Sequence, residues 1–353
     1  MPEPRIRPLR AGGQTPEEIG ATVAGFIDLA QHTLDLALYD VRLPGPVGDL
    51  VAGALRNASA RGVAVRLVFN LDGVRRVPIP PPTRTKPELL AALPIDVRPI
   101  PGEPDLMHHK FVVRDGAALW AGSTNWTLDS WSREENVIVT LDSPEIARAY
   151  TRTFDQLWER HRVEHSGDVE PVPVRVGDAT VRAWFSPSRG PALSARIAAA
   201  IARARRRVRI ASPVITAAPV LATLAQEVSD GRLDLAGVVD QTQIAQVVGQ
   251  WKSNGTSSWK LPLLERALEG APFSGKRSTP YAPGSIHDYM HAKMTVADDT
   301  VFVGSFNLSH SGERNAESVL EIEHAALAER MAAYIDEIRA LYPPADVPLG
   351  AKP

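Results

Sequence analysis

The chain has 353 residues, of which 44% are hydrophobic, so it is long enough to bury two cores or one of double size. Its formal net charge of −2 disfavours a nonspecific nucleic-acid-binding protein, which would more often be basic. The absence of cysteine excludes disulfides and cysteine-bound metals. The N-terminus lacks the apolar stretch of a signal peptide, and no window approaches the roughly 18 apolar residues of a membrane span. We therefore expect a cytoplasmic protein without a transmembrane segment.

The first half of the chain alternates helices and strands. Residues 14–30 place Ile19, Val23 and Ile27 on one side of a helix, and residues 33–41 alternate in the manner of a strand. We expect further helices at 47–60 and 144–161 and further strands at 63–70, 107–114, 118–122 and 136–141. Residues 73–104 hold nine prolines, which predicts an irregular loop.

The second half repeats this order. We expect helices at 192–206, 220–229 and 325–341 and strands at 208–215, 233–240, 290–297, 301–304 and 318–323. The predicted halves span 1–166 and 167–345, with a linker at 164–180 and a tail at 346–353. Strands that alternate with helices predict an α/β fold whose sheets are covered by helices. The segment 242–289 is a second long loop, and like the first it directly precedes a motif strand, where loops overhang a site and select its ligand.

One short phrase occurs twice in the sequence. Both copies read His-x-Lys, four residues, Asp, a short gap and Gly-Ser-x-Asn. The first copy contains His108, Lys110, Asp115, Ser123 and Asn125, and the second contains His291, Lys293, Asp298, Ser305 and Asn307. Each Asn is followed ten residues later by a carboxylate, Glu135 or Glu317. Such short patterns are common singly, but two copies with matched offsets predict two halves that face each other across one site.

The geometry of a strand divides these residues into two groups. Residues two apart share a face, so each His projects together with its Lys. Each Asp lies an odd number of residues further and points away. We therefore assign Asp115 and Asp298, with the motif serines Ser123 and Ser305, to a structural role.

The residues on the shared face suit phosphodiester chemistry. Lys110, Lys293 and the two motif asparagines would stabilise the negative charge that spreads over the phosphoryl oxygens in the transition state. No acidic cluster suited to Mg²⁺ or Mn²⁺ lies beside the motifs, so we expect neither a metal nor another cofactor. A histidine is a competent nucleophile when a carboxylate holds its second nitrogen, and Glu135 and Glu317 are the expected holders.

The paired motifs resemble the HKD motifs of the phospholipase D superfamily. The resemblance implies two α-β-α sandwich halves that form a pseudo-dimer, with one active site at their interface. It also implies a phosphohistidine intermediate, with His108 as the nucleophile and His291 as the general acid, although the near-symmetric sequence does not itself assign these roles. The family often places Asn two residues before the orienting Glu. Asn315 fits, but Arg133 stands there in the first copy, where it would bind a phosphate or form a salt bridge.

The resemblance leaves more than one substrate open. We expect hydrolysis or transfer of a phospholipid, with peripheral contact to a membrane, because the charge is near neutral and Trp251 and Trp259 lie in the second long loop. The alternative is a nuclease, and a phosphate-binding module without activity is disfavoured by the intact motifs. We expect a monomer. His109 should face away from the site as a hydrogen-bonded core histidine.

Overall fold

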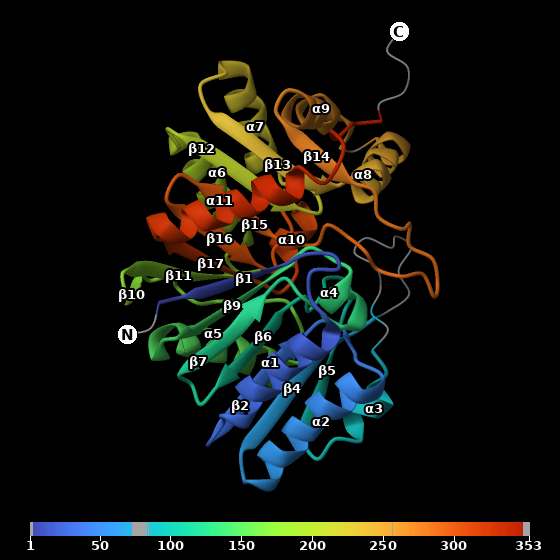
Figure 1. The fold of residues 1–353 in the computed structure, drawn as a ribbon, viewed down its shortest axis with the longest axis vertical. Coiled ribbons are helices and arrows are strands. Elements are labelled where there is room, and N and C mark those ends of the chain that lie inside the picture. Colours follow the sequence, from blue (N-terminus) through green and yellow to red (C-terminus); the bar gives the residue numbers. More distant parts are fainter. Residues whose placement is uncertain (1–2, 73–82, 84, 256, 349–353) are drawn as a thin grey trace.

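Two mixed β-sheets with the same strand order form the centre of the molecule (Figure 1). The computed structural model describes residues 3–72, 83, 85–255 and 257–348. In spatial order, the first sheet contains β1 (Arg5–Leu9), β9 (Asn136–Asp142), β7 (Ala118–Gly122), β6 (Lys110–Arg114), β2 (Thr33–Leu38), β4 (Ala64–Leu71) and β5 (Asp96–Pro101). Strands β2, β4 and β5 are parallel, and the others join antiparallel.

The second sheet repeats all seven of these strands in the same order and adds β10 at its edge. It contains β10 (Val174–Val176), β11 (Ala179–Ser186), β17 (Glu317–Glu323), β16 (Thr300–Gly304), β15 (Met294–Ala297), β12 (Arg207–Ser212), β13 (Asp234–Asp240) and β14 (Phe273–Lys276). The run β11 to β14 corresponds to the run β1 to β5 in the first sheet. A small ribbon pairs β3 (Val41–Arg42) with β8 (Trp126–Thr127). The predicted repetition of one plan is confirmed.

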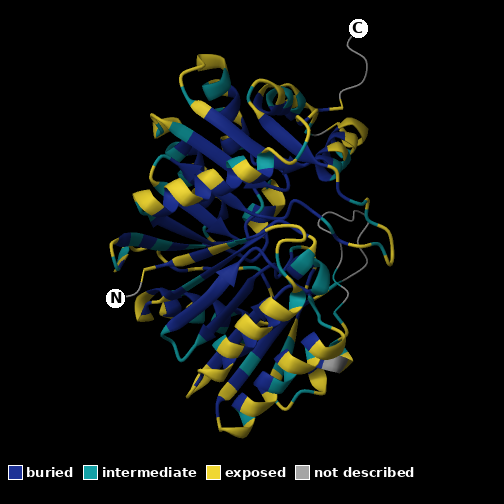
Figure 2. Ribbon diagram, in the orientation of Figure 1, coloured by how far each residue is buried: buried dark blue, intermediate teal, exposed yellow. Residues whose placement is uncertain are grey.

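Helices cover both faces of each sheet. The first half contains α1 (Pro16–Asp28), α2 (Gly45–Ala60), α3 (Pro87–Ala91), α4 (Leu128–Ser132) and α5 (Pro144–Arg160). The second contains α6 (Gly190–Arg203), α7 (Ala218–Asp230), α8 (Gln241–Asn254), a 3-10 turn η1 (Ser258–Lys260), α9 (Leu261–Glu269), α10 (His310–Arg314) and α11 (Ala325–Arg339). Helix α1 begins at Pro16, two residues after the predicted start, where Thr15 and Glu18 form a reciprocal capping box. Figure 2 shows buried strands between helices whose outer faces are exposed.

The apolar core is continuous between the two halves. One cluster joins side chains of α5, such as Tyr150 and Phe154, to side chains of α11, such as Met331 and Ile335, and to strands of both sheets. Separate clusters lie under α1 and α2 in the first half and under α6 to α9 in the second. The halves are therefore packed together through α5 and α11. None of the helices among the described residues is long and apolar enough to span a membrane.

The prediction of an irregular loop at 73–104 was wrong for two of its parts. Pro87 stands in the first turn of α3, where a backbone N–H has no helical acceptor. Pro99 and Pro101 lie in β5, which forms an edge of the sheet and tolerates missing donors. Residues 73–82 and 84 lie outside the described residues.

Three further boundaries differ from the prediction. Strand β10 and the start of β11 lie inside the predicted linker at 164–180. The predicted loop at 242–289 contains nearly all of α8, and α9 and β14. The last two correspond to α3 and β5, whereas α8 has no counterpart among the described residues of the first half. In the predicted tail, Val347 packs in the apolar cluster under α6 to α9, and its N–H donates to Glu269. Residues 346–348 are therefore packed against the second half.

Candidate active site

Backbone contacts between the halves bring the two motifs together. Met107 pairs with Ala316 of the second half, and Met290 pairs with Glu135 of the first. In the same way the N–H of His108 donates to the carbonyl of Ala316 at 2.9 Å, and the N–H of His291 donates to the carbonyl of Glu135 at 3.0 Å. Each motif histidine thus sits where its own half meets the other.

The two motif lysines lie buried in this region. Lys110 and Lys293 are 2% and 3% exposed, and each ammonium donates to the carbonyl oxygen of its own motif histidine, at 2.5 and 2.7 Å. Burial lowers the pKa of both, and the charge of Lys293 lowers that of Lys110 further, while Glu134 and Glu317 act in the opposite direction. The effect of Lys293 on Lys110 shows that cations from both halves lie close together in one site.

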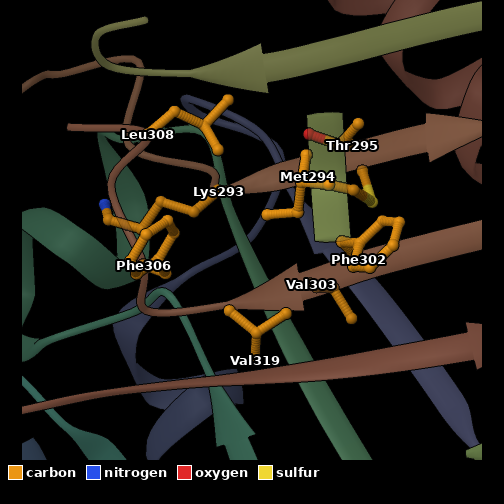
Figure 3. A pocket seen from close by; sticks show the side chains of 9 residues that line it. Lys293, Met294, Thr295, Phe302, Val303, Phe306, Leu308 and Val319 are labelled. Atoms are coloured by element: carbon orange, nitrogen blue, oxygen red, sulfur yellow. The ribbon is translucent and has the colours of Figure 1, made fainter. Parts of the chain in front are cut away.

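The surroundings of Lys293 explain its desolvation. Its stem borders a small cavity of about 10 Å³ that is lined mainly by apolar side chains. In Figure 3 the ammonium nitrogen points away from Met294, Phe302 and Val319. The apolar lining provides no counter-charge, so the charged form depends on the carboxylates across the site.

His108 is held by a carboxylate from the other half. Its Nδ1 lies 2.8 Å from Oε2 of Glu317, and both side chains are fully buried. Burial raises the pKa of Glu317 to about 8, against the charge of Lys110. Tyr39, which the sequence analysis missed, lies edge-on to His108 with ring centroids 4.5 Å apart and 4.7 Å from the ammonium of Lys110. The predicted orientation of a motif histidine by Glu317 is confirmed for His108.

The equivalent prediction for Glu135 was wrong. Glu135 forms an ion pair with Lys276 at 2.6 Å and accepts a hydrogen bond from the hydroxyl of Tyr342. The Nδ1 of His291 instead lies 3.0 Å from Oδ1 of Asn136 and 3.5 Å from Oε2 of Glu134.

The register of the sheets gives the reason. Gly122 pairs with Ile138 and Gly304 pairs with Val319, so the position two residues before these partners is Asn136 in the first half and Glu317 in the second. Asn136 follows Asn125 by eleven positions, whereas Glu317 follows Asn307 by ten. Counting ten positions from Asn125 therefore gives Glu135, one residue before the true counterpart.

A sequence signal for this correspondence was available. The segment Glu134–Asn136 reads Glu-x-Asn, which is the reverse of Asn-x-Glu at 315–317. Arg133 is therefore not the counterpart of Asn315, and it forms a salt bridge to Asp129 at 3.1 Å with its side chain 53% exposed.

The motif glycines and serines shape the turn that carries Asn125 and Asn307. A Cβ at Gly122 or Gly304 would collide with the carbonyl oxygen of Val137 or Ser318, so only glycine fits. The serine hydroxyls then accept the N–H of those same strands, Ser123 from Val137 at 2.9 Å and Ser305 from Ser318 at 3.0 Å. These bonds agree with the predicted structural role of both serines.

Asn125 and Asn307 follow these turns, and unlike Ser123 and Ser305 each has a side-chain oxygen without a hydrogen bond to the described residues. The Oδ1 of each is buried and has no hydrogen-bond partner among the described residues. Buried polar atoms are rarely left unpaired, and functional sites are a common exception. A half-turn of either amide would present N–H groups at the same place, as a phosphate ligand requires.

Asp115 and Asp298 fix the turns after the motif strands. The carboxylate of Asp115 accepts the backbone N–H groups of Gln31, His32 and Thr33. Asp298 accepts those of residues 205–207 in the same manner. Burial opposes ionisation, but the backbone donors outweigh it and lower the pKa of both carboxyls. Both side chains thus serve the predicted structural role.

His109 lies in the core, but it is not satisfied as predicted. Its ring contacts Phe111 and Phe185, and neither ring nitrogen has a hydrogen-bond partner among the described residues. Burial, followed by the charge of Lys110, lowers its pKa to about 3, so the ring is neutral.

The two tryptophans proposed for substrate contact have different positions. Trp251 is 8% exposed and packs in the core under α8 and α9, against the expectation of substrate or membrane contact. Trp259 is 58% exposed. Both rings lie near the ammonium of Lys260, which donates to the carbonyl of Thr216 at 2.9 Å.

Comparison with known proteins agrees with this geometry. A sequence profile of the family described as "Cardiolipin synthase, PLD-like domain" matches residues 23–158 and 197–339, which together make up most of the chain and contain one motif each. The chain belongs to this phospholipase D-like family. The predicted resemblance and the two-half fold are thereby confirmed.

Two curated relatives each align with 37% of the chain. The mitochondrial cardiolipin hydrolase of Xenopus laevis is 32% identical over 133 residues, which are 37% of this chain and 57% of that protein. The phospholipase D of Rickettsia conorii is 24% identical over 132 residues, 37% of this chain and 60% of that protein. The chain thus spans about half the length of these phospholipase D-like relatives.

Solved structures match the whole fold. The phosphatidylserine synthase of Haemophilus influenzae Rd KW20 superposes with a TM-score of 0.66 at 12% identity, over 95% of this chain and 86% of that one. The polyphosphate kinase of Porphyromonas gingivalis gives 0.59 at 12% identity, over 95% of this chain and 47% of that one. At these identities the likeness establishes the two-half phospholipase D-like fold alone.

Proposed function

We propose that this protein is a phosphodiesterase that acts through a phosphohistidine intermediate. The observation that carries the proposal is the hydrogen bond between His108 and Glu317, buried beside a second histidine and two lysines from both motifs. A carboxylate on Nδ1 keeps the proton there and leaves Nε2 as the nucleophile. Family membership and the matched motifs support the same chemistry.

The reaction follows from these positions. The Nε2 of His108 attacks phosphorus, a P–N bond forms, and the P–O bond to the leaving alcohol breaks while His291 gives that oxygen a proton. His291 then takes a proton from water or an acceptor alcohol, whose oxygen attacks phosphorus and breaks the P–N bond. His108 is returned unchanged, and the product is a phosphomonoester or a new diester.

Lys110 and Lys293 would supply the positive charge that this reaction needs. Charge accumulates on the non-bridging oxygens, and buried cations stabilise it more strongly than exposed ones. A bound phosphodiester would in turn favour the charged lysines. We therefore expect activity to survive chelation of divalent ions by EDTA.

The proposed substrate is a phospholipid. The names of the curated relatives, cardiolipin hydrolase and phospholipase D, support this class. A cavity of about 360 Å³ in the first half, lined mostly by apolar side chains of α2, α3 and the sheet, gives further support. Its lining includes Leu38 and Trp126, which are chain neighbours of Tyr39 and Asn125.

The test compares substrates and variants. We expect the protein to hydrolyse bis-p-nitrophenyl phosphate in EDTA, and vesicles of phosphatidylcholine or cardiolipin more readily than single-stranded DNA. Ala52→Phe, which fills the cavity, should reduce vesicle hydrolysis but spare the small diester, whereas Ala60→Phe on the exposed side of α2 should change neither. Salt-sensitive cleavage of DNA without lipid hydrolysis would instead identify a nuclease.

A further inference from the structure

The two motif histidines are held by different chemical groups. Each half provides one carboxylate and one amide, two residues apart, but the order is reversed. In the second half the carboxylate of Glu317 contacts His108, and the amide of Asn315 stands behind it at 3.4 Å. In the first half the amide of Asn136 contacts His291, and the carboxylate of Glu134 stands behind it at 2.9 Å. The two halves therefore differ at the atom that contacts each histidine ring, which is Oε2 of Glu317 for His108 and Oδ1 of Asn136 for His291. These atoms influence how strongly each ring binds a second proton.

Glu134 fixes which end of the Asn136 amide faces His291. The Nδ2 of Asn136 donates to Oε2 of Glu134 and to the carbonyl of Ser130 at 3.2 Å. Its Oδ1 accepts from the hydroxyl of Ser123 at 2.7 Å, so Oδ1 is the atom that meets the ring of His291. An amide oxygen only accepts hydrogen bonds. The Nδ1 of His291 therefore carries a proton in both forms of the ring. In the imidazolium form Nε2 carries the second proton, which is the one that can be given to the leaving oxygen.

The reversal also changes how each ring holds an added proton. A carboxylate in direct contact stabilises an imidazolium cation, whereas an amide oxygen brings no charge. The carboxylate of Glu134 is 3.5 Å from His291 and accepts from Asn136 and from the hydroxyl of Ser130, at 2.7 Å. A positive charge on the ring is therefore stabilised more strongly at His108 than at His291.

From this geometry we infer that Glu134, acting through Asn136, is a positioning residue that makes His291 the proton donor and leaves His108 as the nucleophile. This inference rests on the proposed function. His108 becomes positively charged when phosphorus bonds to Nε2, and Glu317 stabilises that charge. His291 releases its proton to the leaving alcohol, which a weaker hold on the proton favours.

Several charged groups face His291 and must be counted. Burial lowers its pKa, and Lys293, Lys110 and His287 lower it further, while a hydrogen bond with the backbone of Ser123 raises it. Burial raises the pKa of Glu134, against its hydrogen bonds from Ser130 and Asn136 and the charges of Lys293 and Lys276. Because the lysines also lose protons on the alkaline side, the protonation of His291 has to be measured separately from the rate.

The experiment moves the charge without changing the shapes. Glu134→Gln with Asn136→Asp places a carboxylate directly against His291, and we expect its pKa, followed by NMR of the labelled imidazole, to rise by about one unit or more. The alkaline limb of kcat should shift in the same direction. The mirrored control is Asn315→Asp with Glu317→Gln, which removes the carboxylate in contact with His108. We expect this variant to form the phosphohistidine more slowly, measured as a slower burst of alcohol release in the first turnover.

The outcomes separate the two proposals. Circular dichroism verifies that both double variants fold, and the single change Asn136→Asp provides a second test if the double variant does not. An unchanged pKa of His291 and an unchanged alkaline limb in a folded variant would overturn the assignment of Glu134. Full turnover in His108→Ala would overturn the proposed function instead.

Discussion

The ionisable side chains of the site lie where water is largely absent, and each therefore depends on its neighbours for its charge. Burial lowers the pKa of Lys110 and Lys293 and raises that of Glu317 to about 8. A lysine with a lowered pKa loses its charge as pH rises, and a carboxyl with a raised pKa loses its charge as pH falls. The charged forms coexist because they interact with one another.

This coupling predicts a narrow pH optimum. As pH rises above about 7, Lys293 loses its proton, phosphate binding weakens and KM for a diester should increase. The pKa of Lys110 is lowered as well, so its charge is lost in the same direction. As pH falls below about 8, Glu317 takes up a proton, His108 loses its acceptor and kcat/KM should decrease. Steady-state kinetics on bis-p-nitrophenyl phosphate across the pH range provides the measurement, and a KM that does not vary with pH would contradict it.

The histidines should act as one unit. We expect His108→Ala and His291→Ala each to lower turnover by at least ~10³-fold, because one loses the nucleophile and the other the proton donor. The double variant should be little slower than either single variant. Asp230→Ala, an exposed carboxylate on α7, is a suitable control and should leave turnover unchanged. Losses that multiply in the double variant would show that the two rings act independently.

At the residue scale, the sequence alone predicted the site residues that belong to the repeated motif. It did not predict those whose position depends on how the β-strands pair. His, Lys and Asn recur at matched offsets, so their positions could be read directly. The partner of His291 could not, because one added residue before β9 moved Asn136, and not Glu135, into the place that faces the ring. A side chain two strands away from the motif is placed by the sheet pairing, which a single sequence does not contain.

At the scale of elements, strands at the sheet edges were the hardest to predict. Strands β1, β5, β10 and β14 lie at or next to an edge, and β5 also carries prolines that are typical of loops. Central strands such as β7 and β9 were predicted to within a residue, because burial on both faces gives them continuous apolar sequences. The missed strands were therefore edge strands. The central strands β6 and β15 were recognised, but they begin three and four residues later than the predicted 107 and 290.

One contact between elements should stabilise the junction of the halves. Lys276 on β14 is buried, and its ammonium bonds Oε2 of Glu135 at 2.6 Å and the carbonyl of Arg133 at 3.1 Å. Lys276→Met leaves a buried carboxylate without its cation, and we expect a loss of about 3–5 kcal/mol in the free energy of unfolding. Urea denaturation measures it.

The matched control removes a more exposed ion pair, that of Arg133, which lies two residues before Glu135. Arg133→Ala breaks the salt bridge to Asp129, which lies at the surface, and should cost at most about 1 kcal/mol. Equal losses in the two variants would mean that burial of the Lys276 pair adds nothing to the stability of the junction.

At the scale of the whole molecule, both His-x-Lys motifs belong to one chain. Two curated relatives each align with 37% of it, whereas this chain contains two motifs and a continuous core that joins its halves through α5 and α11. The site therefore needs no second copy of the protein. We expect a monomer in solution, with a molar mass near 38.2 kDa by light scattering.

The kinetic consequence is that specific activity should not depend on protein concentration. Dilution dissociates a site shared between two chains but not one built within a single chain, so turnover per molecule should stay constant from micromolar to nanomolar protein. A mixture of His108→Ala and His291→Ala proteins gives the complementary result. If each chain forms its own site, the mixture stays inactive, because every site lacks one histidine. Recovery of activity on mixing, or a fall in specific activity on dilution, would show that the halves of different chains combine to make the site.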